Sequence, residues 1–128
     1  MKYLTFALPE NLQDPRPGVF LNDVVIDLQE ARTWAQGARG LPLEPLPPSL
    51  FEMIYSGFPA LNYARNLAAS REGEDPLRLR GAHRRPAGYQ PQQVVLYPPL
   101  PRPMSLRDFY AFESHVAVAN QIRGREVP

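Results

Sequence analysis

The placement of proline constrains this fold more than any other feature of the chain. Sixteen of the 128 residues are proline, well above the usual share of about 5%. They are concentrated at residues 42–48, 86–91 and 98–103. Proline lacks a backbone N–H and fixes φ, so helices and interior strands do not run through such segments. We therefore expect short elements joined by extended connections.

Composition and charge narrow the function classes. The length favours one domain with a modest core. A net charge of +1 gives no strong attraction to nucleic acid or an anionic membrane. The chain has no cysteine, which excludes disulfides, zinc–thiolate sites and a cysteine nucleophile. It also lacks a signal-peptide pattern and any apolar run near the about 20 residues that cross a bilayer. We expect a soluble cytoplasmic protein with no nucleic-acid or membrane partner.

Short apolar segments predict four strands, at residues 3–8, 18–21, 24–27 and 93–97. The second and third flank Asn22-Asp23, a pair that tolerates positive φ, so a hairpin with a two-residue turn is expected there. Residues 71–91 are charged and rich in arginine, glycine and proline. This segment is expected to be a loop with little structure of its own.

Apolar residues at helical spacing predict three helices before that loop. Asp27 is placed to cap the first, and Gly40 lies just beyond its end. Its apolar stripe comprises Leu28, Ala31, Trp34, Ala35 and Ala38. The second helix covers about residues 49–56, and Gly57 is placed to end it. Pro59 can open the third. The buried side of that helix is predicted to carry Ala60, Tyr63, Ala64, Leu67 and Ala68.

These elements predict an α+β fold in three parts. Residues 1–97 form a small domain of strands, a hairpin and helices, and residues 98–104 are a proline-rich linker. Residues 105–128 begin a second domain with a helix that runs to about residue 123. Ser105 is a natural N-cap for that helix.

The terminal helix carries groups that suit a metal-assisted, base-catalysed reaction. Asp108 and His115 are seven residues apart, so they lie within about 20° of each other on one helix face. A carboxylate near a helix N-terminus stays ionised, which suits a hard-cation ligand. An imidazole on the same face can act as a general base. The spacing alone is equally explained by a capping Asp108 and an exposed His115 without a function.

Residues 99–115, Pro-Leu-Pro-Arg-Pro-Met-Ser-Leu-Arg-Asp-Phe-Tyr-Ala-Phe-Glu-Ser-His, resemble the opening of the catalytic domain in the fumarylacetoacetate hydrolase family. An Asp-Phe-Tyr followed by a His is a hallmark there, and an Arg-Gly-basic triplet follows, as in Arg123-Gly124-Arg125. The leading strand and hairpin are loosely similar to the small N-terminal domain of bacterial members. The resemblance implies the first helix of a mixed-β catalytic domain.

The resemblance implies a role for each of four residues. Asp108 would ligate an active-site Mg²⁺ or Ca²⁺, and His115 would activate water for attack on a carbonyl carbon. Tyr110 and Arg123 would contact the substrate. The implied reaction is hydrolysis of a C–C bond in a 1,3-dicarbonyl acid or, in relatives, an isomerisation or decarboxylation. Chelation of both substrate oxygens by a divalent ion would stabilise the enolate leaving group.

The resemblance also implies that these 128 residues hold only part of the site. The family's Glu-x-Glu pair and later Asp have no counterpart here, and one carboxylate does not hold a cation that takes six or more oxygens. Glu72, Glu74 and Asp75 are interpreted as a solvated turn. The chain alone is therefore expected to be inactive. A homodimer is possible, and the sequence does not decide the oligomeric state. The alternative is a non-catalytic interaction or assembly module, and a third hypothesis is RNA contact through residues 78–85.

Overall fold

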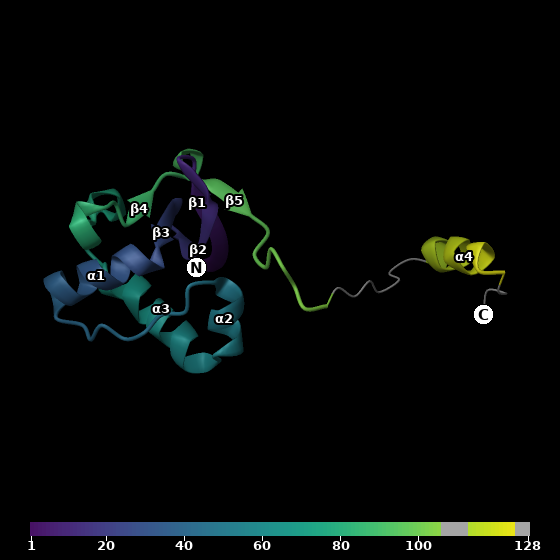
Figure 1. Ribbon diagram of the computed structural model, residues 1–128, viewed down its shortest axis with the longest axis horizontal. Coiled ribbons are helices and arrows are strands. Elements are labelled where there is room, and N and C mark those ends of the chain that lie inside the picture. Colours follow the sequence, from purple (N-terminus) through teal and green to yellow (C-terminus); the bar gives the residue numbers. More distant parts are fainter. Residues whose placement is uncertain (106–112, 125–128) are drawn as a thin grey trace.

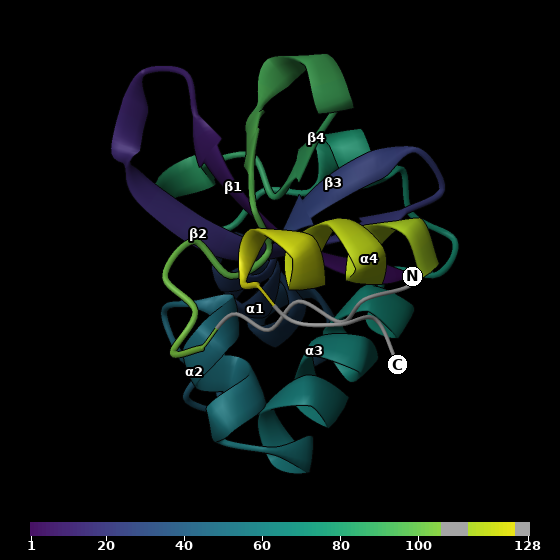
Figure 2. The same cartoon turned by 90° about the vertical axis from the view of Figure 1, so that its right-hand side faces the viewer.

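The computed structural model of the chain describes residues 1–105 and 113–124. Five strands form one antiparallel sheet in the order β4-β3-β2-β1-β5. Helices α1, α2 and α3 gather on one side of this sheet (Figures 1 and 2). The strands are β1 (Lys2–Leu8), β2 (Asn11–Leu21), β3 (Val24–Asp27), β4 (Gly88–Tyr89) and β5 (Val95–Tyr97). The helices are α1 (Leu28–Arg39), α2 (Leu50–Tyr55), α3 (Phe58–Ser70) and α4 (Glu113–Ile122). The predicted α+β class is confirmed.

The predicted hairpin between β2 and β3 is confirmed. Leu21 pairs with Val24, which leaves Asn22 and Asp23 as the two turn residues. Their φ angles are 51° and 59°, as a two-residue turn of the type I′ class requires. Asparagine and aspartate tolerate this left-handed region better than most residues, so the local sequence determines the turn.

Strand β2 is longer than the predicted segment 18–21, because it begins at Asn11 and includes Pro15 and Pro17. β3 pairs with β2 only from Gly18 onward, so the earlier part of β2 has a strand partner on one side only, namely β1. Proline is tolerated at such an edge, where no ladder N–H is needed. Gly18 itself is required by close packing: a Cβ there would lie 2.9 Å from both the Ile26 carbonyl oxygen and the Phe6 ring.

The sheet has an apolar cluster on each face. The larger one packs against the helices and includes Val19, Ile26, Leu28, Met53 and Leu67. The smaller one, on the other face, comprises Phe6, Val25, Tyr89 and Val94. Alternate residues of one strand point to opposite faces, which explains why Val25 and Ile26 belong to different clusters.

The predicted helix ends and the buried face of α3 agree with the structure. Asp27 caps α1, and Gly40 ends it with a φ of 66°. All five residues predicted on the inner side of α3 are buried. On α1 the buried stripe is shorter than predicted, because Ala38 in the last turn is exposed. Ser49 caps α2, and Ile54 near the end of that helix is half exposed.

The prediction of a structureless loop at residues 71–91 is wrong. The segment contains β4, which pairs with β3, and 3₁₀ turns at Pro76–Arg78 and Ala82–Arg84. Three of its apolar residues are buried, namely Leu79, Ala87 and Tyr89. Gly88 permits this packing because a Cβ there would clash with the backbone carbonyl of Pro76. A two-residue strand is too short to give a periodic signal.

Beyond β5 the chain leaves the sheet as a proline-rich strap, residues 98–105, without helix or strand (Figure 1). Its first turn is held by the Thr5 hydroxyl, which donates a hydrogen bond to the Pro99 carbonyl oxygen at 2.7 Å. Helix α4 lies apart from the sheet in Figure 1. The predicted first half of this helix, residues 106–112, lies outside the described residues. Among the helices that the structure describes, none is long and apolar enough to cross a membrane.

Candidate functional site

Of the four site residues predicted from the sequence, two lie within the described part of the structure and two do not. His115 lies within α4. Arg123 is exposed in the turn that follows, where its backbone N–H bonds to the carbonyl oxygens of Ala119 and Asn120. Asp108 and Tyr110 lie outside the described residues. Their convergence on one site therefore stays a prediction.

The acidic residues that precede the strap form no metal site. Glu74 is paired with Arg39 at 2.9 Å, and Asp75 accepts a hydrogen bond from the Leu77 N–H at 3.0 Å. Within residues 1–105 and 113–124 no group of three acidic or histidine side chains could hold a metal ion. This donor set does not fit Mg²⁺ or Ca²⁺, which take six or more oxygens. The solvated-turn interpretation of residues 72–75 agrees with their exposure.

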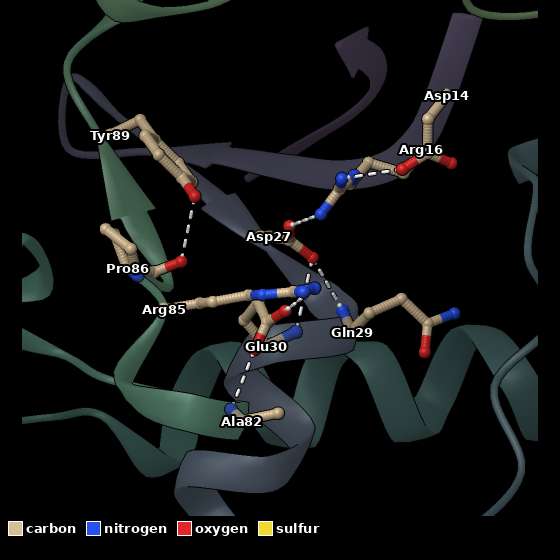
Figure 3. Close-up of polar contacts among 9 residues, drawn as sticks. All are labelled: Asp14, Arg16, Asp27, Gln29, Glu30, Ala82, Arg85, Pro86 and Tyr89. Carbon is tan, nitrogen blue, oxygen red and sulfur yellow. Dashed lines mark hydrogen bonds and ion pairs between the residues drawn. The ribbon is translucent and has the colours of Figure 1, made fainter. Parts of the chain in front are cut away.

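The densest polar cluster in the described chain lies where the sheet meets α1 (Figure 3). Asp27 is fully buried and uses both carboxylate oxygens. Oδ1 accepts from the backbone N–H groups of Gln29 and Glu30, at 2.9 and 3.2 Å. Oδ2 accepts from Nη1 of Arg16 at 3.0 Å, and Nη2 of Arg16 reaches Asp14 at 2.6 Å. The cluster thus joins β2, β3 and α1.

Burial governs the ionisation of this cluster. It raises the pKa of Asp27 above the ordinary value, and the charge of Arg16 and the two backbone N–H groups oppose this shift. Burial also raises the pKa of Tyr89 to about 12, with a further contribution from the negative charge of Asp27. The Tyr89 hydroxyl donates to the Pro86 carbonyl oxygen at 3.0 Å. A phenol this weakly acidic stays protonated and acts here as a hydrogen-bond donor.

Glu30 extends the cluster to the loop that was expected to lack structure. Its side chain is buried, and Oε2 accepts from the Ala82 N–H at 2.8 Å. Oε1 lies 3.8 Å from Nη1 of Arg85, which is mostly exposed. Gly81 permits this approach, because a Cβ there would press on the backbone and carboxylate of Glu30. Glu30 therefore fastens the 3₁₀ turn Ala82–Arg84 to α1 (Figure 3).

A cavity of about 390 Å³ opens beside the cluster, with Arg16, Arg85 and Tyr89 among its lining residues. Each of these three already has a partner inside the protein. The arrangement of these residues therefore holds strand, helix and loop together. Sequence reasoning identified only Asp27, as a helix cap. The contacts of Arg16 with Asp27 and of Glu30 with Ala82 carry no local signal, since they span 11 and 52 residues.

Comparisons with known proteins add no assignment: no protein-family model matches the chain, and no curated protein is significantly similar to it.

Proposed function

We propose that this chain is the N-terminal portion of an enzyme similar to the fumarylacetoacetate hydrolase family. The reaction is metal-dependent hydrolysis of a C–C bond in a 1,3-dicarbonyl acid, or a related isomerisation or decarboxylation. One observation carries the proposal: the proline strap, Asp108-Phe109-Tyr110, His115 and the Arg123-Gly124 pair follow one another in the family's order. In support, the α+β unit ends at β5, the strap follows, and His115 lies on a helix beyond it.

Within this proposal, the chain's own residues have distinct roles. His115 is the general base that accepts a proton from the attacking water, a role for which an imidazole is well suited. Arg123 binds a substrate carboxylate, for which the guanidinium offers two parallel N–H donors. Its exposure after the end of α4 leaves these donors accessible. Tyr110 contacts a substrate oxygen through its hydroxyl group.

The divalent ion places a further requirement on the proposal. Asp108 supplies one oxygen ligand, and the described residues contain no cluster that supplies the rest. In this proposal the remaining carboxylates belong to a longer form of the protein, as the resemblance implies. For the same reason the chain by itself is expected to show no turnover.

The test is to extend the chain with the coding sequence that follows codon 128 and to assay acylpyruvate hydrolysis with Mg²⁺. The extended protein should contain a Glu-x-Glu and be active. Asp108→Asn and His115→Gln should each lower kcat by about 100-fold or more. Gln121→Ala, an exposed change on α4, should leave kcat unchanged. A continuation without further acidic ligands would refute the proposal, and turnover by the 128-residue chain with Mg²⁺ would refute the claim of an incomplete site.

A specific surface feature favours the second candidate, an interaction or assembly module. Three apolar side chains at the junction of α2 and α3 are strongly exposed: Ile54 at 50%, Tyr55 at 81% and Phe58 at 80%. Such clustering is typical of surfaces that bind another protein. Phe58→Ser should then abolish self-association of the chain in sedimentation experiments, whereas Asp108→Ala and His115→Ala should not affect it. A monomer at all concentrations would remove the homodimer from consideration.

A further inference from the structure

Arg71 is a largely buried arginine whose side chain has no hydrogen-bond or ion-pair partner within the described residues. It follows the last residue of α3 and is 8% exposed. Its Nε is buried and has no hydrogen-bond partner, and Arg71 takes part in none of the side-chain hydrogen bonds or ion pairs found among the described residues. Burying a charged group without a partner is costly, so proteins rarely do so without a compensating ligand. Within the part of the chain that the structure describes, no carboxylate lies within ion-pair distance of this guanidinium.

A cavity of about 470 Å³ lies beside Arg71. The β2–β3 hairpin contributes Leu21, Asn22 and Val24 to its wall, and the end of α3 contributes Ala68 and Ala69. The wall therefore combines apolar side chains with the Arg71 guanidinium and the carboxylates of Glu72 and Glu74. Sites for small organic acids are built in this way, with an apolar lining and a few polar groups that fix orientation.

The charges around the cavity indicate which anion fits. Glu72 and Glu74 also line it. Glu74 is neutralised by Arg39 at 2.9 Å, whereas Glu72 is exposed. The charges of Arg71 and Glu72 cancel, so Glu72 would repel a dianion such as phosphate more strongly than a monoanion. The planar guanidinium also matches the two oxygens of a carboxylate.

We propose that this cavity binds a small monocarboxylate. Its two oxygens bind the Arg71 guanidinium, and its short hydrocarbon chain packs on Leu21, Val24 and Ala68. The site is independent of the proposed catalytic function, because it lies on the β2–β3 hairpin and α3 and uses none of the residues assigned to catalysis.

The test is an NMR titration of the full 128-residue chain with butyrate, followed at the Nε–H signal of Arg71 and the amides of Asn22 and Gly73. Saturable shifts with a Kd on the order of 1 mM are expected, the range accessible to a ligand with so few atoms. Butyramide, which has the same shape without the charge, and inorganic phosphate should bind at least about tenfold more weakly. Equal shifts with butyrate and butyramide, or none with butyrate up to about 20 mM, would overturn the proposal.

Variants distinguish a loss of binding at the site from a loss of binding caused by unfolding. Arg71→Lys keeps the charge but loses the planar fork, so the affinity for butyrate should fall about tenfold. Because Arg71 is buried, a second variant leaves it in place: Ala69→Glu adds a carboxylate at an exposed position that lines the cavity. This variant should keep its Tm and lose butyrate binding. Arg65→Ala, also exposed on α3 but away from the cavity, is the matched control. Wild-type affinity in a folded Ala69→Glu protein would contradict the assignment.

Discussion

Replacing Asp27 tests how the polar cluster stabilises the fold. Asp27→Ala removes the cap of α1 and the partner of Nη1 of Arg16 together. Loss of an N-cap costs about 1 kcal/mol. Loss of a buried hydrogen bond to a charged group costs about 2 kcal/mol. The free energy of unfolding should therefore fall by about 3 kcal/mol, a large fraction of the roughly 5–15 kcal/mol typical of a domain.

Asp27→Asn separates the two contributions. Asparagine caps a helix about as well as aspartate, so only the bond to Arg16 is lost, and the expected decrease is about 2 kcal/mol. The difference between the two losses of unfolding free energy measures how much the helix cap contributes. Asp14→Ala is the control, because Asp14 is half exposed and its pair with Arg16 contributes about 1 kcal/mol or less.

Urea unfolding is the assay, followed by the fluorescence of Trp34, the only tryptophan, which lies on α1 itself. The urea concentration at the midpoint of unfolding should fall, while the slope of the unfolding free energy against urea concentration stays constant. Equal losses for Asp27→Ala and Asp27→Asn would refute the capping contribution. Losses below about 0.5 kcal/mol for both would show that the cluster does not stabilise the fold.

Three further predictions concern packing and ionisation. Gly88→Ala should lower the free energy of unfolding by about 2 kcal/mol in urea melts because the site is overpacked. In contrast, Gly37→Ala has open space inside α1 and should raise it by about 0.5–1 kcal/mol. Spectrophotometric titration at alkaline pH should show one phenol with a pKa of about 12, absent in Tyr89→Phe. Because the unfolded state loses this proton first, near pH 10, stability should fall as the pH rises from 10 to 12, and a pH-independent stability there would contradict the assignment. Met53→Ala should cost about 3 kcal/mol in thermal unfolding, whereas the neighbouring exposed Ile54→Ala should change stability by less than about 0.5 kcal/mol.

Sequence reasoning predicted the features that depend on neighbouring residues. The turn at Asn22-Asp23, the Asp27 cap and the inner face of α3 each follow from a few consecutive positions. Their physical causes are local: tolerance of positive φ, a side-chain acceptor for orphan N–H groups, and the period of the helix.

The features that were missed depend on contacts between distant segments. Strand β4 forms because Gly88 fits against the backbone of Pro76 and Tyr89 packs on Phe6, contacts that no local pattern encodes. The bond from Glu30 to the Ala82 N–H is of the same kind. For the candidate site, Asp108 and Tyr110 lie outside the described residues, so their grouping with His115 rests on the seven-residue spacing from Asp108 and on the resemblance.

The prolines beside β5 have a consequence for the solution behaviour of the chain. β5 is an edge strand with exposed Val95 and Leu96, and an open edge of this kind can recruit a strand from another molecule. Pro91 precedes it and Pro98 follows it. Neither has an N–H to offer an incoming strand, so any such pairing is confined to residues 92–97 between them. The prolines that keep the elements short thereby also limit how long a strand could add to this edge of the sheet.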